Sequence, residues 1–137
     1  MNYKLLYDEL HNNEYMHEGE NGSYHFILKH IKKANLEYAT VLDAGCSIGN
    51  GVKIFKDLGK DSTGMDVSEV AIKAAVARGL KAKQGSVLNM PFEDNSFDLV
   101  SSADMLEHLV QSDIPGAINE LFRVTKKVSC IKVIYNS

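Results

Sequence analysis

Val41-Leu42-Asp43-Ala44-Gly45-Cys46-Ser47-Ile48-Gly49-Asn50-Gly51 is the stretch of sequence that decides the fold. Two apolar residues lead into an acidic residue, and a turn rich in glycine then opens a segment with helical character. This order predicts a strand, a tight turn and a helix. Glycine has no side chain, so the backbone of such a turn can come close to a ligand.

A second acidic residue, Asp66, ends the next apolar segment, 21 positions after Gly45. That separation is expected when the second strand of a nucleotide-binding unit presents a carboxylate to a ribose, so the pattern predicts an adenosine-containing ligand. A dinucleotide is disfavoured, because Ser47 and Ile48 break the required Gly-x-Gly-x-x-Gly spacing. A carboxylate at Asp43 would repel phosphate but suits a ligand that carries an amino group or a sulfonium.

The segment from Val41 to Gly49 closely resembles motif I of the class I S-adenosylmethionine-dependent methyltransferases, whose usual form has glycine in place of Ser47. Three later segments are similar to further signatures of that family and follow in its order: Gly85–Val100, Met105–Leu109 and Glu120–Val124. The resemblance implies an α/β fold with a Rossmann-like, doubly wound and mainly parallel sheet. It also implies S-adenosyl-L-methionine as cofactor and S-adenosyl-L-homocysteine as product.

The chain reads as one domain of 137 residues, with an N-terminal helical lid or cap over 1–40 and a cofactor-binding core over 41–137. We expect a short helix over 3–17, a break at 18–23, and a second helix through Ile27, Leu28 and Ile31. Strands are predicted near 41–44, 62–66, 81–85, 98–102 and 128–134, and helices near 49–58, 68–78 and 113–124. Ser68 is the expected N-cap of the second of these helices. The sequence ends directly after the fifth strand, so we expect about five strands without the family's C-terminal hairpin.

Carried over onto this sequence, the resemblance implies a set of residues that bind the cofactor. They are Asp43, Gly45, Cys46, Ser47, Gly49, Asp66, Val67, Ser86, Val87 and Ser102. Asp66 is expected to accept hydrogen bonds from both ribose hydroxyls, with capping of the following helix as the alternative. Asp43 either binds the ammonium of the cofactor, directly or through water, or orients the glycine turn.

Ser86 departs from the family, which commonly has an acidic residue there to hold the adenine amino group. A serine can still accept that hydrogen bond, although it is shorter and neutral. The backbone amide of Val87 can meet a ring nitrogen whatever its side chain. The departure therefore bears on cofactor affinity and not on cofactor identity.

His108 and Asp104 are the candidate catalytic residues, because they follow the fourth strand, where the acceptor is expected. An imidazole titrates near neutral pH and can act as a general base, although a structural histidine is the alternative. No metal site is predicted, since the spacing of His11, His17, Glu18 and Glu20 fits no known ligand signature. Residues 1–24 are expected to close over the cofactor as a lid.

The favoured function is methyl transfer from S-adenosylmethionine to a small-molecule, glycan-like or lipid-like acceptor. The alternative is a non-catalytic or incomplete cofactor-binding module that needs a partner chain. A formal net charge of −3 and short basic clusters give no reason to expect nucleic acid. No apolar run is long enough to span a bilayer, which favours a cytoplasmic protein. We expect a homodimer through the edge strand at 128–136, since exposed apolar edges seek partners.

Overall fold

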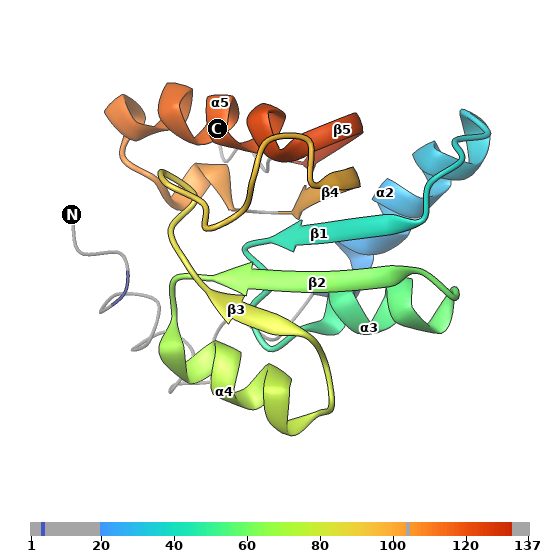
Figure 1. The fold of residues 1–137 in the computed structure, drawn as a ribbon, viewed down its shortest axis with the longest axis horizontal. Coiled ribbons are helices and arrows are strands. Elements are labelled where there is room, and N and C mark those ends of the chain that lie inside the picture. Colours follow the sequence, from blue (N-terminus) through green and yellow to red (C-terminus); the bar gives the residue numbers. More distant parts are fainter. Residues whose placement is uncertain (1–3, 5–19, 104, 133–137) are drawn as a thin grey trace.

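The computed structural model describes residue 4 and residues 20–103 and 105–132, which form one α/β unit (Figure 1). Its centre is a five-stranded sheet in which every neighbouring pair of strands is parallel. The order across the sheet is β3-β2-β1-β4-β5. The strands are β1 (Thr40–Ala44), β2 (Asp61–Asp66), β3 (Ala82–Gln84), β4 (Phe97–Ala103) and β5 (Thr125–Lys132). The predicted fold class, a doubly wound and Rossmann-like sheet, is confirmed.

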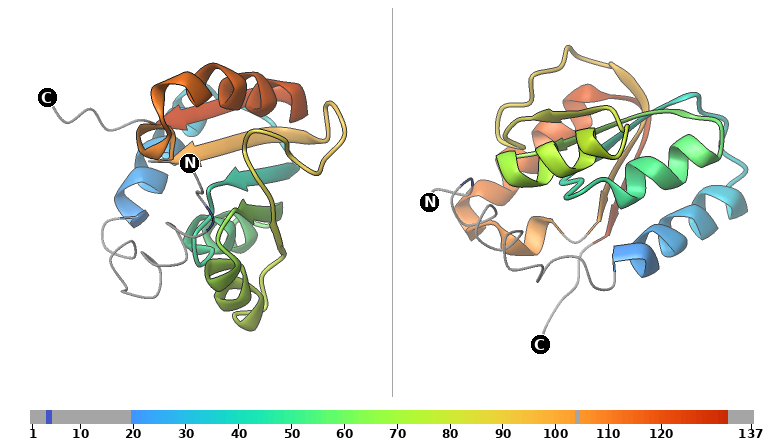
Figure 2. Two further views of the ribbon diagram at one scale, coloured as in Figure 1. Left: turned by 90° about the vertical axis from the view of Figure 1, so that its left-hand side faces the viewer. Right: turned by 90° about the horizontal axis from the view of Figure 1, so that it is seen from below.

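Helices cover both faces of this sheet (Figure 2). The helices are α2 (Glu20–Lys33), α3 (Asn50–Asp57), α4 (Glu69–Ala77) and α5 (Ile114–Val124), with single turns of 3₁₀-helix at Leu106–His108 and Gln111–Asp113. On one face, Ile27 of α2 and Phe55 of α3 pack with Val41 of β1. On the other face, Leu121 of α5 packs with Leu42 of the same strand.

Strand β1 therefore divides its side chains between two cores, because successive residues of a strand point to opposite faces. Val41 contributes to the core under α2 and α3, whereas Leu42 and Ala44 contribute to the core under α5. By the same alternation, Asp43 lies on the face covered by α2 and α3. Asp43, which leads into the glycine turn, is thus covered by helices and is not exposed at the end of the sheet.

Two predicted boundaries are wrong. The break expected at 18–23 is helical from Glu20 onward, because Gly22 and Ser23 occupy the first turn, where the backbone N–H groups have no helical partners in any case. Strand β5 begins at Thr125 and not at 128, since Thr125 takes an extended conformation directly after α5. The predicted N-cap at Ser68 is confirmed, with its hydroxyl accepting from the amide of Ala71 at 3.1 Å. The helix expected over 3–17 and nearly all of the expected lid lie outside the described residues.

No helix in the described part of the chain combines the length and the apolar character that crossing a bilayer requires.

Asp98 joins the amino ends of β4 and β1, which lie at the end of these strands away from the glycine turn. Its carboxylate accepts from the amides of Ala39, at 2.8 Å, and Thr40, at 3.4 Å. The hydrogen bond from Ala39 is the main cause that holds the pKa of Asp98 below its ordinary value of 3.8, with help from Thr40 and Lys127. The folded chain therefore favours the charged form of this carboxyl.

Asp98→Asn is expected to remove a pH-dependent part of the stability. Because the folded pKa is depressed, this contribution is present above the unfolded pKa and is lost as the pH falls through the folded pKa. Thermal unfolding of the wild type and the variant should differ at neutral pH and converge as the pH falls well below 3.8, the ordinary pKa of this carboxyl. A difference between the two proteins that stays constant down to that pH would contradict the assignment.

Candidate functional site

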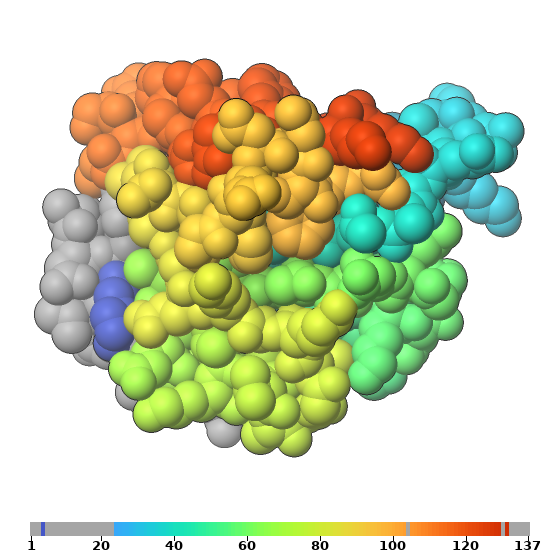
Figure 3. All heavy atoms as spheres, viewed as in Figure 1, coloured from blue at the N-terminus to red at the C-terminus, as the bar shows by residue number. Residues whose placement is uncertain are grey.

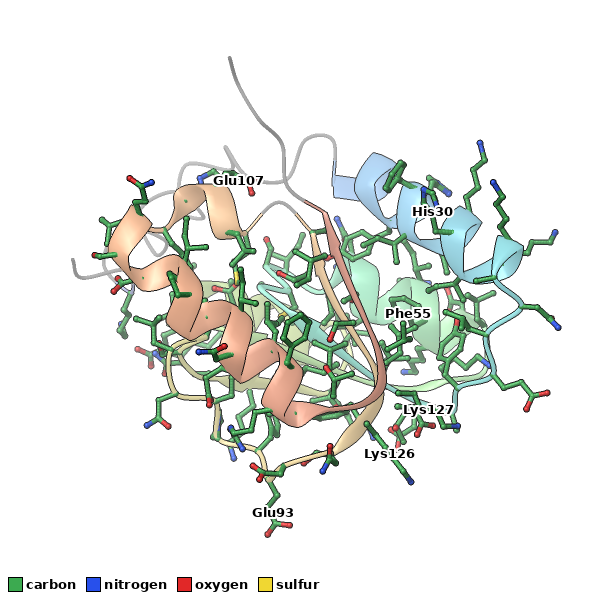
Figure 4. The ribbon with its side chains drawn as sticks, turned by 90° about the horizontal axis from the view of Figure 1, so that it is seen from above. His30, Phe55, Glu93, Glu107, Lys126 and Lys127 are labelled. Carbon is green, nitrogen blue, oxygen red and sulfur yellow. The ribbon has the colours of Figure 1, made fainter. Side chains whose placement is uncertain are left out.

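The candidate site lies at the carboxyl ends of β1, β2 and β4. Within the sheet, β2 is the neighbour of β1 on one side and β4 is its neighbour on the other side. Such a point, where the order of strands reverses, is where open parallel sheets bind ligands. Glu107, which follows β4, marks this end of the sheet, and Lys126 and Lys127 lie at the opposite end (Figure 4).

The turn after β1 is held in an unusual backbone conformation. Gly45, Ser47 and Gly49 have φ angles of 79°, 53° and 93°, all in the left-handed region. The amides of Gly45 and Cys46 both donate to the carbonyl of Met65, at 2.8 and 2.9 Å, which ties the turn to β2. Ser47 is the one residue of the three with a side chain, so it carries the strain that glycine would avoid at this position.

The two glycines of the turn have different surroundings. A Cβ atom at Gly49 would lie 2.6 Å from Leu80 Cδ1, which follows α4, and 3.3 Å from the Cβ of Ala75 on α4. Together with the φ of 93°, this packing accounts for glycine there without a ligand. A Cβ at Gly45 would lie 3.1 Å from the side chain of Met105, which follows β4. Gly45 therefore lets the turn approach the segment after β4, where the acceptor was expected.

Asp66 connects the turns that follow β1 and β2. It is only 6% exposed, and its two carboxylate oxygens accept from the amides of Ser47, at 2.8 Å, and Ser68, at 2.9 Å. The bond from Ser68 fits the role given above as the alternative, that of holding the start of helix α4. The bond from Ser47 ties the carboxylate to the glycine turn, and contact with ribose hydroxyls stays a prediction.

Asp43 is fully buried in a network of three side chains from three elements. Its Oδ2 accepts from the hydroxyl of Tyr24 on α2 at 2.6 Å, and its Oδ1 accepts from the hydroxyl of Ser101 on β4 at 2.9 Å. The network connects α2 to the strand that leads into the glycine turn. Of the two roles expected for Asp43, this burial favours orientation of the turn.

The loop after β3 contains the residues expected beside adenine. The hydroxyl of Ser86 accepts from the amide of Leu88 at 3.1 Å, and the carbonyl of Ser86 accepts from the amide of Asn89 at the same distance. Ser86 is half-buried and Val87 is 8% exposed. The serine thus closes its own tight turn, and its hydroxyl hydrogen can still be donated outward.

Ser102 carries a buried polar atom without a hydrogen-bond partner in the described part of the chain. Its side chain is 1% exposed, and its Oγ has no hydrogen-bond partner among residues 20–103 and 105–132. An unsatisfied buried hydroxyl is costly, and such groups often mark places that a ligand or water completes. Ser102 stands directly after Ser101, which pairs with Asp43, so it belongs to the same end of the sheet. Asp66 and Ser102 lie toward the carboxyl ends of β2 and β4, the two strands that flank β1, and as a pair of polar groups they fit an adenosine ligand that carries a polar tail.

The remaining predicted site residues are less central. The thiol of Cys46 is buried, packs with Val52 and Leu80, and donates to the carbonyl of Ser47 at 3.4 Å. Val67 is half-buried, and its carbonyl accepts from the Gln84 amide.

The two candidate catalytic residues follow β4. The side chain of His108 is 43% exposed in the 3₁₀ turn, with its Nε2 4.0 Å from Glu107 Oε1. Asp104 lies outside the described residues, as do His11, His17 and Glu18 of the rejected metal cluster. No metal-binding group of His, Cys, Asp and Glu side chains occurs in the described ranges.

Several residues that shape the site were missed in the sequence. Ser101 was not selected, although a polar residue inside an apolar strand is a signal of a buried partner. Tyr24 was expected on a lid, whereas it is 3% exposed and bonded to Asp43. Glu120 and Arg123 were noted only as part of a family signature, and they prove to bind the loop after the adenine segment.

Comparison with known proteins identifies the family of this chain. The chain matches the family described as "Methyltransferase domain" over residues 42–130, which is more than half of its length. It is 34% identical over 95 residues to a sterol 24-C-methyltransferase of Gibberella zeae, covering 63% of this chain and 24% of that protein. It is also 34% identical over 93 residues to norajmaline N-methyltransferase of Rauvolfia serpentina, covering 61% of this chain and 31% of that protein.

A solved SAM-dependent methyltransferase of Methanosarcina mazei superposes with a TM-score of 0.65 and 26% identity, over 70% of this chain and 52% of that chain. The chain thus spans between about a quarter and a half of the length of these three proteins. The matched residues include the glycine turn, Asp66 and the segment after β4. On these grounds, the chain belongs to the methyltransferase domain family.

Proposed function

We propose that this chain binds S-adenosyl-L-methionine and transfers its methyl group to a small-molecule, glycan-like or lipid-like acceptor. The observation that carries the proposal is the buried carboxylate of Asp66, held by two amides at the end of β2 beside the left-handed glycine turn. A ribose with two adjacent hydroxyls suits such a carboxylate. The unpartnered hydroxyl of Ser102, within the described residues, is a second polar group that a ligand would complete.

The residues of the chain divide the work of holding the cofactor. Asp66 would accept from the ribose hydroxyls, Ser86 and Val87 would meet the adenine edge, and Gly45 and Ser102 would border the methionine portion. When bound, the cofactor supplies an electrophilic methyl group on a sulfonium. Because the transfer is a direct displacement, the protein's main contribution is to hold the acceptor in line, which is worth about 7–11 kcal/mol in favourable cases.

His108 is proposed as the group that takes a proton from the acceptor. Its imidazole is partly exposed after β4, within the segment that approaches the glycine turn through Met105. A positioned base typically contributes about 10²–10⁴-fold to such a reaction. Asp104 is proposed to hold the acceptor or the methionine end beside it.

A specific observation favours the alternative, a cofactor-binding module without activity of its own. Ser47 occupies a left-handed position that normally selects glycine, and Ser86 replaces the acidic residue usual in the family. Both substitutions would weaken the grip on the cofactor. In this alternative, a partner chain would complete the cofactor site. The homodimer through the edge strand at 128–136 and the cytoplasmic location remain predictions. Residues 133–136 of that edge lie outside the described part.

Product formation distinguishes the two functions. The protein would be incubated with S-adenosylmethionine and pools of hydroxyl, amine and carboxylate acceptors, and S-adenosylhomocysteine would be measured by mass spectrometry. Acceptor-dependent product that disappears in His108→Ala supports the methyltransferase and the proposed base. Tight binding of S-adenosylhomocysteine without product in any pool supports the non-catalytic module.

Ser86→Asp tests the departure from the family in the adenine loop. A carboxylate at this position can accept from the amide of Leu88, as the serine does, and from the adenine amino group with a stronger, charge-assisted bond. We expect the variant to bind S-adenosylhomocysteine as tightly as the wild type or up to about tenfold more tightly, by calorimetry. A loss of binding with unchanged circular dichroism would show that the loop is arranged differently.

A further inference from the structure

Two charged residues of α5, Glu120 and Arg123, form hydrogen bonds with the segment that follows the adenine loop. Arg123 donates from Nη2 to the carbonyl of Met90, at 3.1 Å, and from Nη1 to the carbonyl of Phe92, at 2.8 Å. The same Nη1 donates to the carboxylate of Asp94 at 2.9 Å. Glu120 accepts from the amide of Met90 at 2.7 Å. We call residues 90–95 the clamped loop.

The clamp is rigid because its two members are also bonded to each other. The guanidinium of Arg123 donates to both oxygens of Glu120, from Nε at 2.6 Å and from Nη2 at 3.0 Å. The backbone carbonyl of Arg123 accepts from the amide of Asn95 at 2.9 Å, which closes the far end of the clamped loop. The bonds from Arg123 hold the pKa of Glu120 below its ordinary value, so the pair stays charged near neutral pH.

The clamped loop contacts the start of the adenine loop. A Cβ at Gly85 would lie 2.9 Å from the ring of Pro91, so these two residues are in direct contact. Gly85 immediately precedes Ser86, and the amide of Gly85 is bonded to the carbonyl of Asp66 at 3.0 Å. Figure 3 shows the segment between β3 and β4, in yellow and gold, lying on the surface against α5, in orange and red. A shift of the clamped loop would therefore move the backbone that meets adenine.

We propose that Arg123 and Glu120 are positioning residues for adenine: they fix the clamped loop, and through the contact of Pro91 with Gly85 they set the place of Ser86 and Val87. This inference rests on the proposed function, because it presumes that the adenine edge lies at Ser86 and Val87. The pair acts on the loop proposed for the base, whereas Asp66 is the residue proposed for the ribose. Loosening the clamp should thus reduce selectivity for adenine more than it reduces general affinity.

Arg123→Lys tests this inference. Lysine keeps the positive charge but cannot reproduce the planar fork that reaches two carbonyls and two carboxylates. The measurement is calorimetric binding of S-adenosylhomocysteine and of S-inosylhomocysteine, in which hypoxanthine replaces adenine. We expect the preference of the wild type for adenine to fall by about three- to tenfold in the variant. A general loss of stability would weaken the binding of both ligands equally and leave the ratio of their affinities unchanged.

Arg78→Lys is the matched control. Arg78 is an exposed arginine that donates to the carbonyl of Ile48, within the glycine turn, and to Asn50, the first residue of α3. The variant therefore loses an arginine at the proposed site without touching the clamped loop, and any general effect on affinity should apply to both ligands. This control should keep the adenine preference of the wild type. If Arg123→Lys does not fold, Glu120→Gln removes the charge of the partner with less disturbance and should lower the same ratio.

The outcomes separate this inference from the proposed function. A wild type that prefers adenine, with a variant that keeps the full preference, overturns the positioning role and leaves the proposed function intact. A wild type that binds both ligands equally also overturns it, since the loop then does not read the base. A wild type that binds neither ligand rejects the proposed function and the inference that rests on it.

Discussion

Asp66→Ala is expected to lower the affinity for S-adenosylhomocysteine by about tenfold or more. The carboxylate would lose two hydrogen bonds to the ribose, each worth about 1.5–3 kcal/mol when one partner is charged. The substitution also removes the acceptor of the amides of Ser47 and Ser68, so the turns after β1 and β2 would be held less firmly. Calorimetric titration measures the loss directly.

Asp61→Ala is the control for this prediction. Asp61 is an exposed carboxylate at the opposite end of the same strand, where it pairs with Lys81. Its removal should leave ligand affinity unchanged. Thermal unfolding of both variants would show that each is folded at the temperature of the titration. Undiminished binding by Asp66→Ala would exclude this residue from the cofactor site.

Gly51→Ala is expected to destabilise the fold by about 2 kcal/mol, despite its position in a helix. Alanine is favoured over glycine in helices by about 1 kcal/mol, so propensity alone predicts a gain. A Cβ at this position, however, would overlap the ring of Tyr24 and lie 2.5 Å from Asp43 Oδ2. Overpacking of this kind costs about 1–3 kcal/mol, and here it would also disturb a buried hydrogen bond. Urea unfolding gives the free energy.

Gly116→Ala provides the matched comparison. Gly116 also lies near the start of a helix, α5, but a Cβ there would meet only Leu88, at 3.9 Å. With open space, the propensity should prevail and the variant should gain about 0.5–1 kcal/mol. A lower free energy of unfolding for Gly51→Ala and a higher one for Gly116→Ala would support the close packing of Tyr24 against α3. A Gly51→Ala protein as stable as the wild type would contradict it.

The elements of the fold could be predicted because their signals are local. The apolar run at Val41 and Leu42, the glycine turn and the N-cap at Ser68 each specify their own backbone, and all three appear as expected. The errors fall at boundaries, where local signals conflict. Gly22 and Ser23 indicate a break by composition, yet they can be accommodated in the first turn of α2.

The network around Asp43 could not be predicted, because it depends on which strands become neighbours. Asp43 and Ser101 are 58 positions apart and meet only because β1 pairs with β4. The partner from α2, Tyr24, reaches them because that helix packs on the same face. Local patterns contain no information on this neighbourhood. The clamp of Glu120 and Arg123 on the loop some thirty residues earlier has the same origin.

Calorimetric titration of the wild-type chain with S-adenosylhomocysteine tests the central claim most directly. We predict one site per chain, and binding that adenosine in excess competes away, because the ribose and adenine contacts at Asp66 and Ser86 are shared by both ligands. No heat and no protection of the glycine turn from hydrogen exchange, at millimolar ligand and with the protein folded, would contradict a cofactor site at this edge of the sheet.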